Sequence, residues 1–408
     1  MRFQTKSLLA FLTLVLILLN ILAFNSPMGK AQTGTSVNGI IYSDTTWTKA
    51  NSPYRLTGPV AVSVGVTLTI QAGTTVYLGS YYIQVNGTLV AIGDTANAII
   101  FNGGTINFEQ SSNSWNEQTQ TGCIIDHATL SCSINIYNAS PLISNNQLFV
   151  GPSGGISVYG GSPVILKNTC DGAISVYDEG LALISNNAID GAWGGIGCYS
   201  QNCDVIDNTF SGCQYAITMG QGSSMGGTIE GNLLYQNNVG IYCGPGQAII
   251  QNNTIANSTL GIQMPYSSSS EIIYNNIQNN QISISLIDSS SNKLDSNNVN
   301  ATYNWWGTTD TQAINQTIFD FKNNFNLGTV NFVPFLNAPN LQAPILPTST
   351  STPTTATSAA SPTPNLTPSS APVIKSAVPE LSWLAVLLLL LSIFFVAVVF
   401  RQRKVRYD

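Results

Sequence analysis

Charged residues are scarce in this sequence. Only 8% of the 408 residues are Asp, Glu, Lys or Arg, about a third of the share that is usual in globular proteins. Between positions 32 and 378 there are six basic and seventeen acidic residues, which gives a net charge of −11. Because no basic stripe is present to neutralise phosphates, the composition excludes a nucleic-acid partner.

Basic side chains of the kind that enzymes use are also rare. Arg55 is the only Arg between the two terminal segments, and His127 is the only His in the chain. Helix formers are few outside the two ends, and Gly, Ser, Thr and Asn take the place of charged residues. This composition is typical of a chain that makes many tight turns.

The sequence does contain a repeat with a period near 22 residues. The repeat is aligned on one asparagine per unit: Asn146, Asn168, Asn187, Asn208, Asn232, Asn253, Asn275 and Asn297. About three positions before each of them stands a branched apolar residue: Ile143, Ile165, Ile184, Ile206, Ile229, Ile250, Ile273 and Leu294. An apolar-x-apolar pair also recurs in every unit, from Ile134 and Ile136 to Ile282 and Ile284.

Three short period-2 segments per unit predict three short strands. Such a unit cannot bury its own apolar face, so we expect units to stack, each strand pairing in parallel with its counterpart in the next. The predicted fold class is all-β, a right-handed three-sheet parallel β-helix of about 11 coils over residues 56–300. Asn suits the turn between two sheets because it tolerates left-handed backbone and can bond the amide of the next coil.

Both ends of the chain are predicted to be membrane-targeting segments. Residues 1–31 combine Lys6 with an apolar run and small residues near Ala31, so they predict a secretory signal peptide, with an uncleaved anchor as the alternative. Leu381 to Phe400 carries no charge and basic residues follow it, so residues 379–408 predict a transmembrane helix with a cytoplasmic tail. Residues 339–378, rich in Pro, Thr and Ser, predict an extended stalk. The predicted location is the cell membrane, with a single pass and an extracellular domain.

Caps are expected at both ends of the coils, because uncovered strand edges aggregate. Residues 32–55 predict an N-terminal cap with Trp47 and Tyr54 as lids. Residues 301–338 predict a C-terminal cap that includes an amphipathic helix from Thr309 to Phe325. The polar stretch from Gly103 to Gly122 predicts a loop that leaves one coil.

Export makes two kinds of covalent modification relevant. Asn-x-Ser/Thr sequons are candidate glycosylation sites; they occur at Asn86, Asn138, Asn252, Asn257, Asn300, Asn315 and Asn365. Of the seven Cys, Cys170, Cys198 and Cys243 fall in inward columns and are predicted to be small core residues. Disulfide partners remain open among Cys123, Cys132, Cys203 and Cys213.

Two pairs of carboxylates are predicted to stack on adjacent coils: Asp171 with Asp190, and Asp207 with Glu230. Carboxylates about 5 Å apart repel each other unless a cation or a shared proton intervenes. Each pair is therefore a candidate Ca²⁺ site, a candidate glycosidase pair, or a column of solvated surface charge. No other cofactor is predicted.

A row of tyrosines is predicted on the outer face of four successive coils: Tyr137, Tyr159, Tyr177 and Tyr199. Sugars stack on exposed aromatic rings, so the row is a candidate glycan platform. The alternative is that stacked rings simply stabilise a parallel sheet.

The coils, the Asn column and the Asn304-Trp-Trp-Gly-Thr-Thr-Asp segment resemble the secreted right-handed parallel β-helix repeat proteins. That set includes the pectate-lyase-like fold and the periplasmic NosD-like repeat proteins, and the resemblance covers residues 56–336. In addition, Val378-Pro379-Glu380-Leu381 resembles the Pro-Glu-Phe type sorting signal of archaeal surface proteins, although its third position is Leu. That resemblance implies processing near the motif, with a plain transmembrane anchor as the alternative.

The first resemblance implies lyases that use Asp-bound Ca²⁺ with an Arg or Lys base, or hydrolases that use several Asp. No coil carries an Arg, so the arginine-based lyase site is not transferred to any position. His127 is a candidate acid/base or an ordinary turn histidine, and one His with two inward Met does not supply a copper site. We therefore predict a non-catalytic surface adhesion, envelope or glycan-binding protein whose partners are polysaccharide or envelope components. The alternative is a polysaccharide lyase or glycoside hydrolase.

Overall fold

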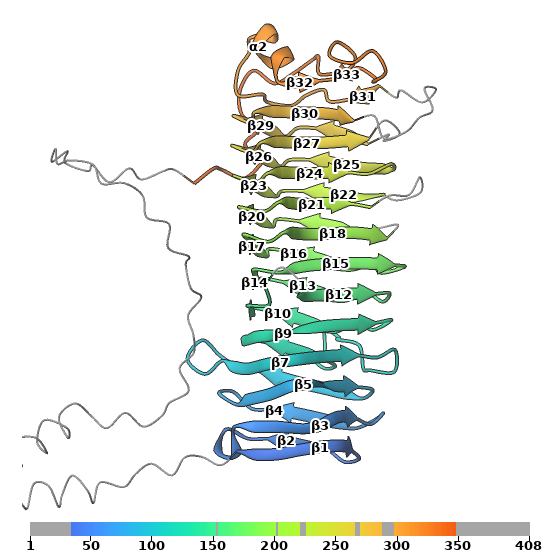
Figure 1. The fold of residues 1–408 in the computed structure, drawn as a ribbon, viewed down its shortest axis with the longest axis vertical. Coiled ribbons are helices and arrows are strands. Elements are labelled where there is room, and N and C mark those ends of the chain that lie inside the picture. The colour runs from blue at the N-terminus through green and yellow to red at the C-terminus, as the bar shows by residue number, and fades with distance from the viewer. Residues whose placement is uncertain are drawn as a thin grey trace, which may run out of the picture. The chain divides into compact units, whose positions relative to one another are not determined.

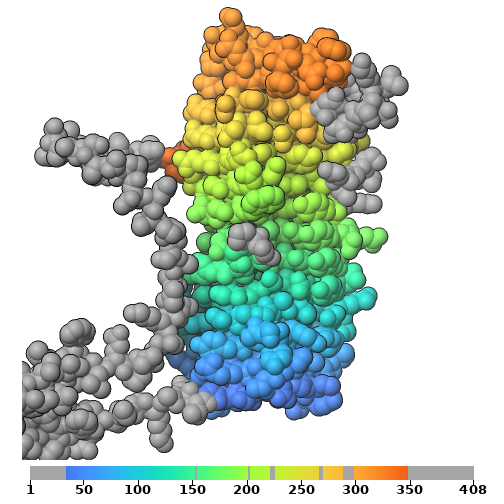
Figure 2. All heavy atoms as spheres, viewed as in Figure 1, coloured from blue at the N-terminus to red at the C-terminus, as the bar shows by residue number. Residues whose placement is uncertain are grey.

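The fold is a parallel β-helix of about eleven coils, as predicted, seen in a computed structural model (Figure 1). The structure describes residues 34–151, 154–200, 203–220, 226–265, 270–287 and 298–347. Each strand pairs in parallel with the strand one coil away, so β10 pairs with β8 on one side and β13 on the other. Figure 2 shows the side chains of successive coils following one another along the stack without a break.

One side of the stack is a thirteen-stranded sheet that includes strands from the segments at both ends of the coils. Its strands are β2 (Thr45–Trp47), β4 (Thr67–Ile70), β6 (Thr88–Ile92), β8 (Ile124–Asp126), β10 (Leu142–Ser144), β13 (Val164–Leu166), β16 (Leu183–Ser185), β19 (Asp204–Ile206), β22 (Gly226–Glu230), β25 (Gln247–Gln251), β28 (Glu271–Ile273), β31 (Val299–Asn300) and β33 (Val330–Asn331).

The other two predicted sheets are joined into one twenty-stranded sheet. In the first coils a single long strand per coil runs through both of these predicted sheets. These strands are β1 (Thr35–Ile41), β3 (Tyr54–Val62), β5 (Thr75–Val85), β7 (Ile99–Phe108) and β9 (Ala128–Tyr137). Because β9 pairs with both β11 and β12, the later strands remain connected to the same sheet. The prediction of three separate sheets was therefore wrong in this respect.

Beyond β9 each coil contributes two strands to the twenty-stranded sheet, one short and one longer. The short strands are β11 (Gln147–Leu148), β14 (Thr169–Cys170), β17 (Ala188–Asp190), β20 (Thr209–Ser211), β23 (Leu233–Tyr235), β26 (Thr254–Ala256) and β29 (Asn276–Gln278). The longer column is β12 (Gly155–Tyr159), β15 (Ala173–Asp178), β18 (Gly194–Ser200), β21 (Tyr215–Met219), β24 (Val239–Cys243), β27 (Leu260–Pro265), β30 (Ile282–Ile287) and, at its end, β32 (Ile318–Phe319).

Aliphatic side chains fill the interior in aligned columns. One column consists of Ile143, Ile165, Ile184, Val205, Ile229, Ile250 and Ile272, all with exposures of 0%. The predicted members Ile206 and Ile273 lie one residue out of register, since Ile206 pairs with Glu230 and Ile273 with Gln251. The true spacing is three residues before the ladder Asn in every coil.

The N-terminal coil begins earlier than predicted. Residues 32–55 were expected to cap the helix, but β1 already pairs in parallel with β3, and β2 with β4. Trp47 and Tyr54 are both 3% exposed and stack with ring centroids 4.9 Å apart, so they fill the first coil. A 3-10 turn, η1 (Lys49–Asn51), lies between them.

The predicted helix from Thr309 to Phe325 is mostly wrong. Only α2 (Thr311–Gln316) forms, and Asp310 caps it by accepting bonds from the N–H groups of Gln312 and Ala313. The chain then pairs as β32 against β30, because the open edge of the last coil offers backbone partners that a continued helix would leave unused. Phe321 and Phe325 are 56% and 73% exposed.

Two further boundaries also differ from the prediction. Gly103 lies within β7, because that part of the predicted Gly103–Gly122 loop continues the pairing with β5 and β9. The stalk was predicted to begin at residue 339, yet Asn340 exchanges hydrogen bonds with the side chain of Asn276 at 2.7 and 3.0 Å. The chain at Asn340 therefore packs back against the coils.

Several predictions fall outside the described residues. They are the signal peptide over residues 1–31, the stalk beyond residue 347, the anchor over residues 379–408, Leu294, Asn297 and Asn365. Within the part of the chain that the structure describes, no helix is both long enough and apolar enough to cross a membrane.

Candidate functional site

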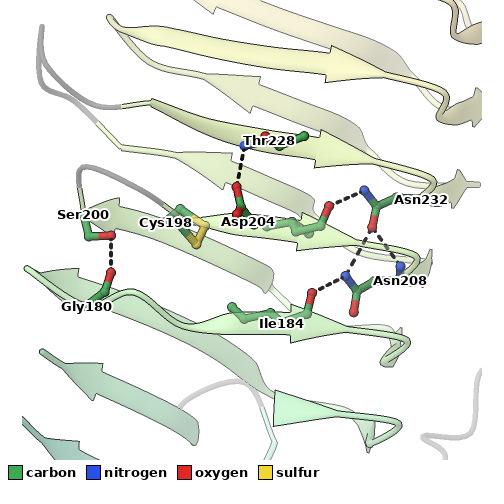
Figure 3. Close-up of a disulfide and its surroundings, with 10 residues drawn as sticks. Gly180, Ile184, Cys198, Ser200, Asp204, Asn208, Thr228 and Asn232 are labelled. Carbon is green, nitrogen blue, oxygen red and sulfur yellow. Dashed lines mark hydrogen bonds between the residues drawn. A yellow bond between two sulfur atoms is a disulfide. The ribbon is translucent and has the colours of Figure 1, made fainter. Parts of the chain in front are cut away.

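The turn between the thirteen-stranded sheet and the short strands, here called the ladder turn, is built on stacked asparagines. Asn146, Asn168, Asn187, Asn208, Asn232, Asn253 and Asn275 are each at most 1% exposed. In every case Nδ2 donates to Oδ1 of the Asn one coil further on, as at Asn208 and Asn232, 3.2 Å (Figure 3). The same Oδ1 accepts the backbone N–H of the preceding ladder Asn, so the column satisfies buried backbone groups that the turn would otherwise leave unpaired.

The eighth ladder position is filled by Asn304. Asn275 Nδ2 donates to Asn304 Oδ1 at 3.0 Å, across a separation of 29 residues. The predicted member, Asn297, lies outside the described residues. A constant period near 22 residues predicted Asn297 instead of Asn304, because this coil is longer than the others.

The left-handed backbone that the turn requires belongs to the residue before each ladder Asn, rather than to the Asn itself. The values of φ lie between 50° and 66° at Asn145, Lys167, Asn186, Asp207, Gly231, Asn252, Tyr274 and Tyr303, and at His127, which precedes Ala128 at the corresponding turn of the preceding coil. These nine residues, called the left-handed column, vary in type. The ladder Asn are buried, but this column includes exposed side chains such as Lys167 and Tyr274.

The predicted tyrosine row forms one continuous stack. The ring centroids of Tyr137, Tyr159, Tyr177 and Tyr199 are 5.1 to 5.2 Å apart, and neighbouring planes are inclined by 9° to 13°. A Cβ at Gly220 would lie 3.0 Å from Tyr199 Cδ1, so backbone lies against the last ring. Because neighbouring rings cover one another's faces, the two inner rings have only their edges and hydroxyls open, and this geometry favours the stabilising alternative over a sugar-stacking platform.

A second group of aromatic side chains, here called the aromatic cluster, was not anticipated. Trp193 packs edge-on against Tyr215 at 6.2 Å and 62°, and Tyr215 packs edge-on against Tyr242 at 6.3 Å and 89°. Trp193 is 68% exposed. Edge-on packing leaves ring faces uncovered, so this cluster offers the open aromatic surface that the tyrosine row lacks. Since the three residues have no common repeat phase, periodicity alone could not reveal them.

Three of the four predicted carboxylates have other partners, including Glu230, which accepts from Asn252 Nδ2 at 3.0 Å. Asp171 Oδ1 accepts the N–H groups of Val150 and Gly151 at 2.8 and 3.1 Å, and Asp190 Oδ1 accepts the hydroxyl of Ser211 at 2.6 Å. Asp207 and Glu230 are not in register, because Glu230 pairs with Ile206. Within the described ranges no three His, Cys, Asp or Glu side chains are grouped as metal ligands would be. A Ca²⁺ site at Asp171 and Asp190 stays a prediction.

Cysteine pairing differs from the prediction at one position. Cys198, expected to be a core thiol, forms a disulfide with Cys203 across a separation of five residues (Figure 3). The expectation compared Cys198 only with residues in its own inward column, whereas its partner follows it in the same coil. Cys123, Cys132, Cys170 and Cys213 are buried thiols outside any disulfide. Burial raises the pKa of Cys132 and of Cys170 to about 12.

The sequons lie at or near the surface wherever they are described. Asn138, Asn257, Asn300 and Asn315 are exposed, and Asn86 and Asn252 are half-buried. Asn252 differs because Nδ2 donates to Glu230 at 3.0 Å and Oδ1 accepts from Asn340 at 2.9 Å. Asn300 is similar, since Nδ2 donates to Glu271 at 3.3 Å and Oδ1 accepts from the Thr302 hydroxyl at 2.9 Å. Both amides are thus engaged on both atoms, which favours the other sequons as glycan acceptors.

His127 is held by a neighbouring carboxylate. Its Nδ1 lies 2.6 Å from Asp126 Oδ2, while Asp126 Oδ1 accepts from Ser144 Oγ at 2.6 Å and Asn145 Nδ2 at 2.7 Å. Desolvation raises the pKa of Asp126, but the bonds from Ser144, Asn145 and His127 outweigh it, so the net shift is downward. In a neutral imidazole, an ionised Asp126 favours the tautomer with the proton on Nδ1, which leaves Nε2 as an acceptor.

Comparison with known proteins agrees with this architecture. The family described as "Periplasmic copper-binding protein (NosD)" matches residues 143–334. No curated protein and no solved structure matches the chain. Together with the stacked coils, the match defines a parallel β-helix repeat protein that is similar to NosD-type periplasmic proteins over these residues.

The donor set of the coils does not fit the copper in that family's name. Copper sites use imidazole together with thiolate or thioether sulfur. The one imidazole, His127, is bound to Asp126, and Cys198 is consumed in a disulfide. Met219 and Met264 belong to an inward column and are 4% and 0% exposed, while the thiol of Cys243 between them in that column lies 3.1 Å from the Ser270 hydroxyl. These sulfur side chains pack the apolar interior.

Proposed function

We propose that the protein is a cell-surface β-helix that binds polysaccharide without transforming it. The NosD-type similarity supports a location outside the cytoplasm. The low charge and the polar outer strand faces suit a hydroxyl-rich ligand, which is recognised by hydrogen bonds and by contact with aromatic rings.

The exposed indole of Trp193 is the observation that carries the proposal. A side chain of this size that is 68% exposed, while the aliphatic columns are buried, has a large apolar face open to water. Tyr215 and Tyr242 continue the aromatic cluster along two further coils. Sugar rings present apolar C–H faces, so a glycan chain lying along the coils could stack on Trp193 and bond to the tyrosine hydroxyls.

A glycan array probed with the full-length protein in detergent tests this proposal. Trp193→Ala should weaken binding about tenfold, and Trp193→Phe should keep part of it. Phe321→Ala is the matched control, because Phe321 is 56% exposed but lies in the C-terminal cap. An array signal that is absent from the parent, or unchanged by Trp193→Ala, would refute the role of the aromatic cluster.

We further propose that residues 1–31 export the chain and that residues 379–408 anchor it, with the Val378-Pro379-Glu380-Leu381 segment as a sorting signal. The support is the apolar runs and the basic tail in the sequence. Protease treatment of intact cells should remove the coils and leave a membrane-bound C-terminal fragment. Protection of the coils from protease would refute this topology.

A polysaccharide-degrading enzyme is the second candidate, and the Asp126–His127 pair favours it. A carboxylate that fixes an imidazole with one nitrogen available is an arrangement used in acid–base catalysis. An assay of the full-length protein on a polysaccharide panel, with and without Ca²⁺, separates the candidates. Product formation that His127→Asn abolishes would establish the enzyme, and no product on any substrate would support the binding protein.

A further inference from the structure

A cleft of about 520 Å³ crosses three consecutive ladder turns. Each coil contributes one member of the left-handed column and the strand residue two positions later. These residues are His127 and Thr129, Asn145 and Gln147, and Lys167 and Thr169. Strand pairing aligns Thr129, Gln147 and Thr169, so two parallel rows of polar side chains line the cleft, about 4.8 Å apart from coil to coil.

The loop between β6 and β7 forms a wall of this cleft, through Asp94, Thr95 and Ala98. Asp94 Oδ1 accepts the backbone N–H groups of Ala96 and Asn97, both at 2.8 Å, and these bonds lower the pKa of Asp94. Asn97 Oδ1 in turn accepts from Lys49 Nζ at 2.8 Å. The wall is therefore fixed before any ligand binds, which limits the entropy lost on binding.

Asp94, which lines the cleft, and Asp126, which lies behind His127, are both committed to donors of the protein itself. Asp94 is bonded within its own loop, and Asp126 is bonded to His127, Ser144 and Asn145. The ammonium of Lys167 is different, because among the described residues it has neither an ion pair nor a hydrogen bond. In a chain with this acidic excess, the cleft thus presents an uncompensated cation beside an imidazole that has a spare nitrogen.

Lys167 also occupies a conformation that lysine disfavours. Its φ is 56°, where a side chain other than Gly, Asn or Asp costs about 1 kcal/mol. The same turn is made by Asn145, Asn186 and Gly231 at comparable φ, so the backbone does not require a lysine here. Its presence is better explained by its place in the cleft.

We propose that this cleft binds a carboxylated saccharide. The Lys167 ammonium pairs with the sugar carboxylate. The amides of Asn145 and Gln147 and the hydroxyls of Thr129 and Thr169 bond to ring hydroxyls, and His127 Nε2 accepts a hydrogen bond from a further hydroxyl. The site is separate from the aromatic cluster, and binding here holds whether or not a reaction follows.

Calorimetric titration of the full-length protein in detergent tests the inference with two ligands. One is a linear trigalacturonate and the other is its carboxyl-reduced counterpart, which has the same linkage and no charge. The parent should bind the trigalacturonate about tenfold more tightly, or better, than the reduced form. Equal affinities, or no heat from either ligand up to millimolar concentration, would overturn the proposal.

Variants of the cleft sharpen the test. Lys167→Asn should fold, because Asn makes the same turn in neighbouring coils, and it should abolish the preference for the charged ligand. Arg55→Gln is the matched control: it removes a cation that lies 4.3 Å from the Tyr77 ring and outside the cleft, and the preference should persist. A preference that survives Lys167→Asn would contradict the assignment, even if Trp193→Ala had no effect on the glycan array.

Discussion

Two columns of residues run side by side along the ladder turn and differ in almost every respect. The ladder Asn are buried, and their side chains hydrogen-bond from coil to coil. The left-handed column, one residue earlier, contains His, Asn, Lys, Asp, Gly and Tyr with nearly the same backbone. The buried position therefore needs one particular side chain. The neighbouring position needs only a backbone conformation, so the side chains of the left-handed column are available for binding.

The largest effect is expected from Asn208→Asp in the buried column. The change keeps an acceptor for Asn187 but removes the Nδ2 that donates to Ile184 O and Ile206 O, and it buries a charge among oxygens. We expect a loss of about 4 kcal/mol in the free energy of unfolding at neutral pH. Guanidinium unfolding measures it, and the loss should shrink at acidic pH, where the carboxyl is protonated. A pH-independent loss below about 1 kcal/mol would contradict the claim that the buried position needs an Asn side chain.

The buried thiols predict an alkaline limit to stability. Because burial raises the pKa of Cys132 and Cys170 from 9.0 to about 12, the folded chain keeps these protons while the unfolded chain releases them. The contribution of these thiols to the free energy of unfolding is fully present below pH 9. It should be lost as pH rises toward 12, by roughly 1.4 kcal/mol per pH unit for each thiol. Urea unfolding from pH 8 to pH 11 checks this. The Cys132→Ala and Cys170→Ala variants should show a smaller decline, and an equal decline in variants and parent would contradict the assignment.

A smaller effect is expected at Asp126, which supports the exposed column. Its pKa is lowered, so its contribution to stability is present above its ordinary value of 3.8 and is lost as pH falls through the lowered folded value. The thermal midpoint of the parent should therefore fall faster below pH 4 than that of Asp126→Asn. Parallel acid profiles would show that the bonds from Ser144, Asn145 and His127 add no net stability.

The smallest effect belongs to Lys167→Gly. Glycine removes the left-handed strain but gives the unfolded chain more freedom, so the free energy of unfolding should change by less than about 1 kcal/mol. Affinity for the charged saccharide should nevertheless fall to that for its carboxyl-reduced counterpart. Thermal unfolding and calorimetry of the same sample measure both quantities. A large loss of stability would mean that Lys167 holds the turn rather than a ligand.

Much of this fold could be predicted from the sequence, because its interior depends on a repeated phase. The Asn positions and the inward Ile set strand type, pairing partner and coil number, and these follow from spacing alone. The misses occur where tertiary contacts override local pattern. Ile318 joins β32 at the open edge of the last coil instead of extending a helix, and Asn304 enters the ladder from an unusually long coil.

The candidate sites were harder to predict, because the residues that build them are not repeated from coil to coil. The tyrosine row was visible as a period, but that its rings cover one another depends on side-chain geometry. Trp193 and Lys167 carry no periodic signal, and only the stacked coils bring Lys167 to the cleft that His127 also lines. In retrospect, one feature of the sequence marks Lys167. It stands directly before a ladder Asn, at a left-handed position where Asn or Gly makes the same turn and lysine is disfavoured.

One matched pair of variants tests the division between the two columns most directly. Asn186→Gly and Asn187→Gly are the same chemical change one residue apart, at a left-handed position and at a ladder position that is 1% exposed. Guanidinium unfolding should show a loss of about 3 kcal/mol or more for Asn187→Gly and a change within about 0.5 kcal/mol for Asn186→Gly. Equal losses for the two variants would contradict the division of roles.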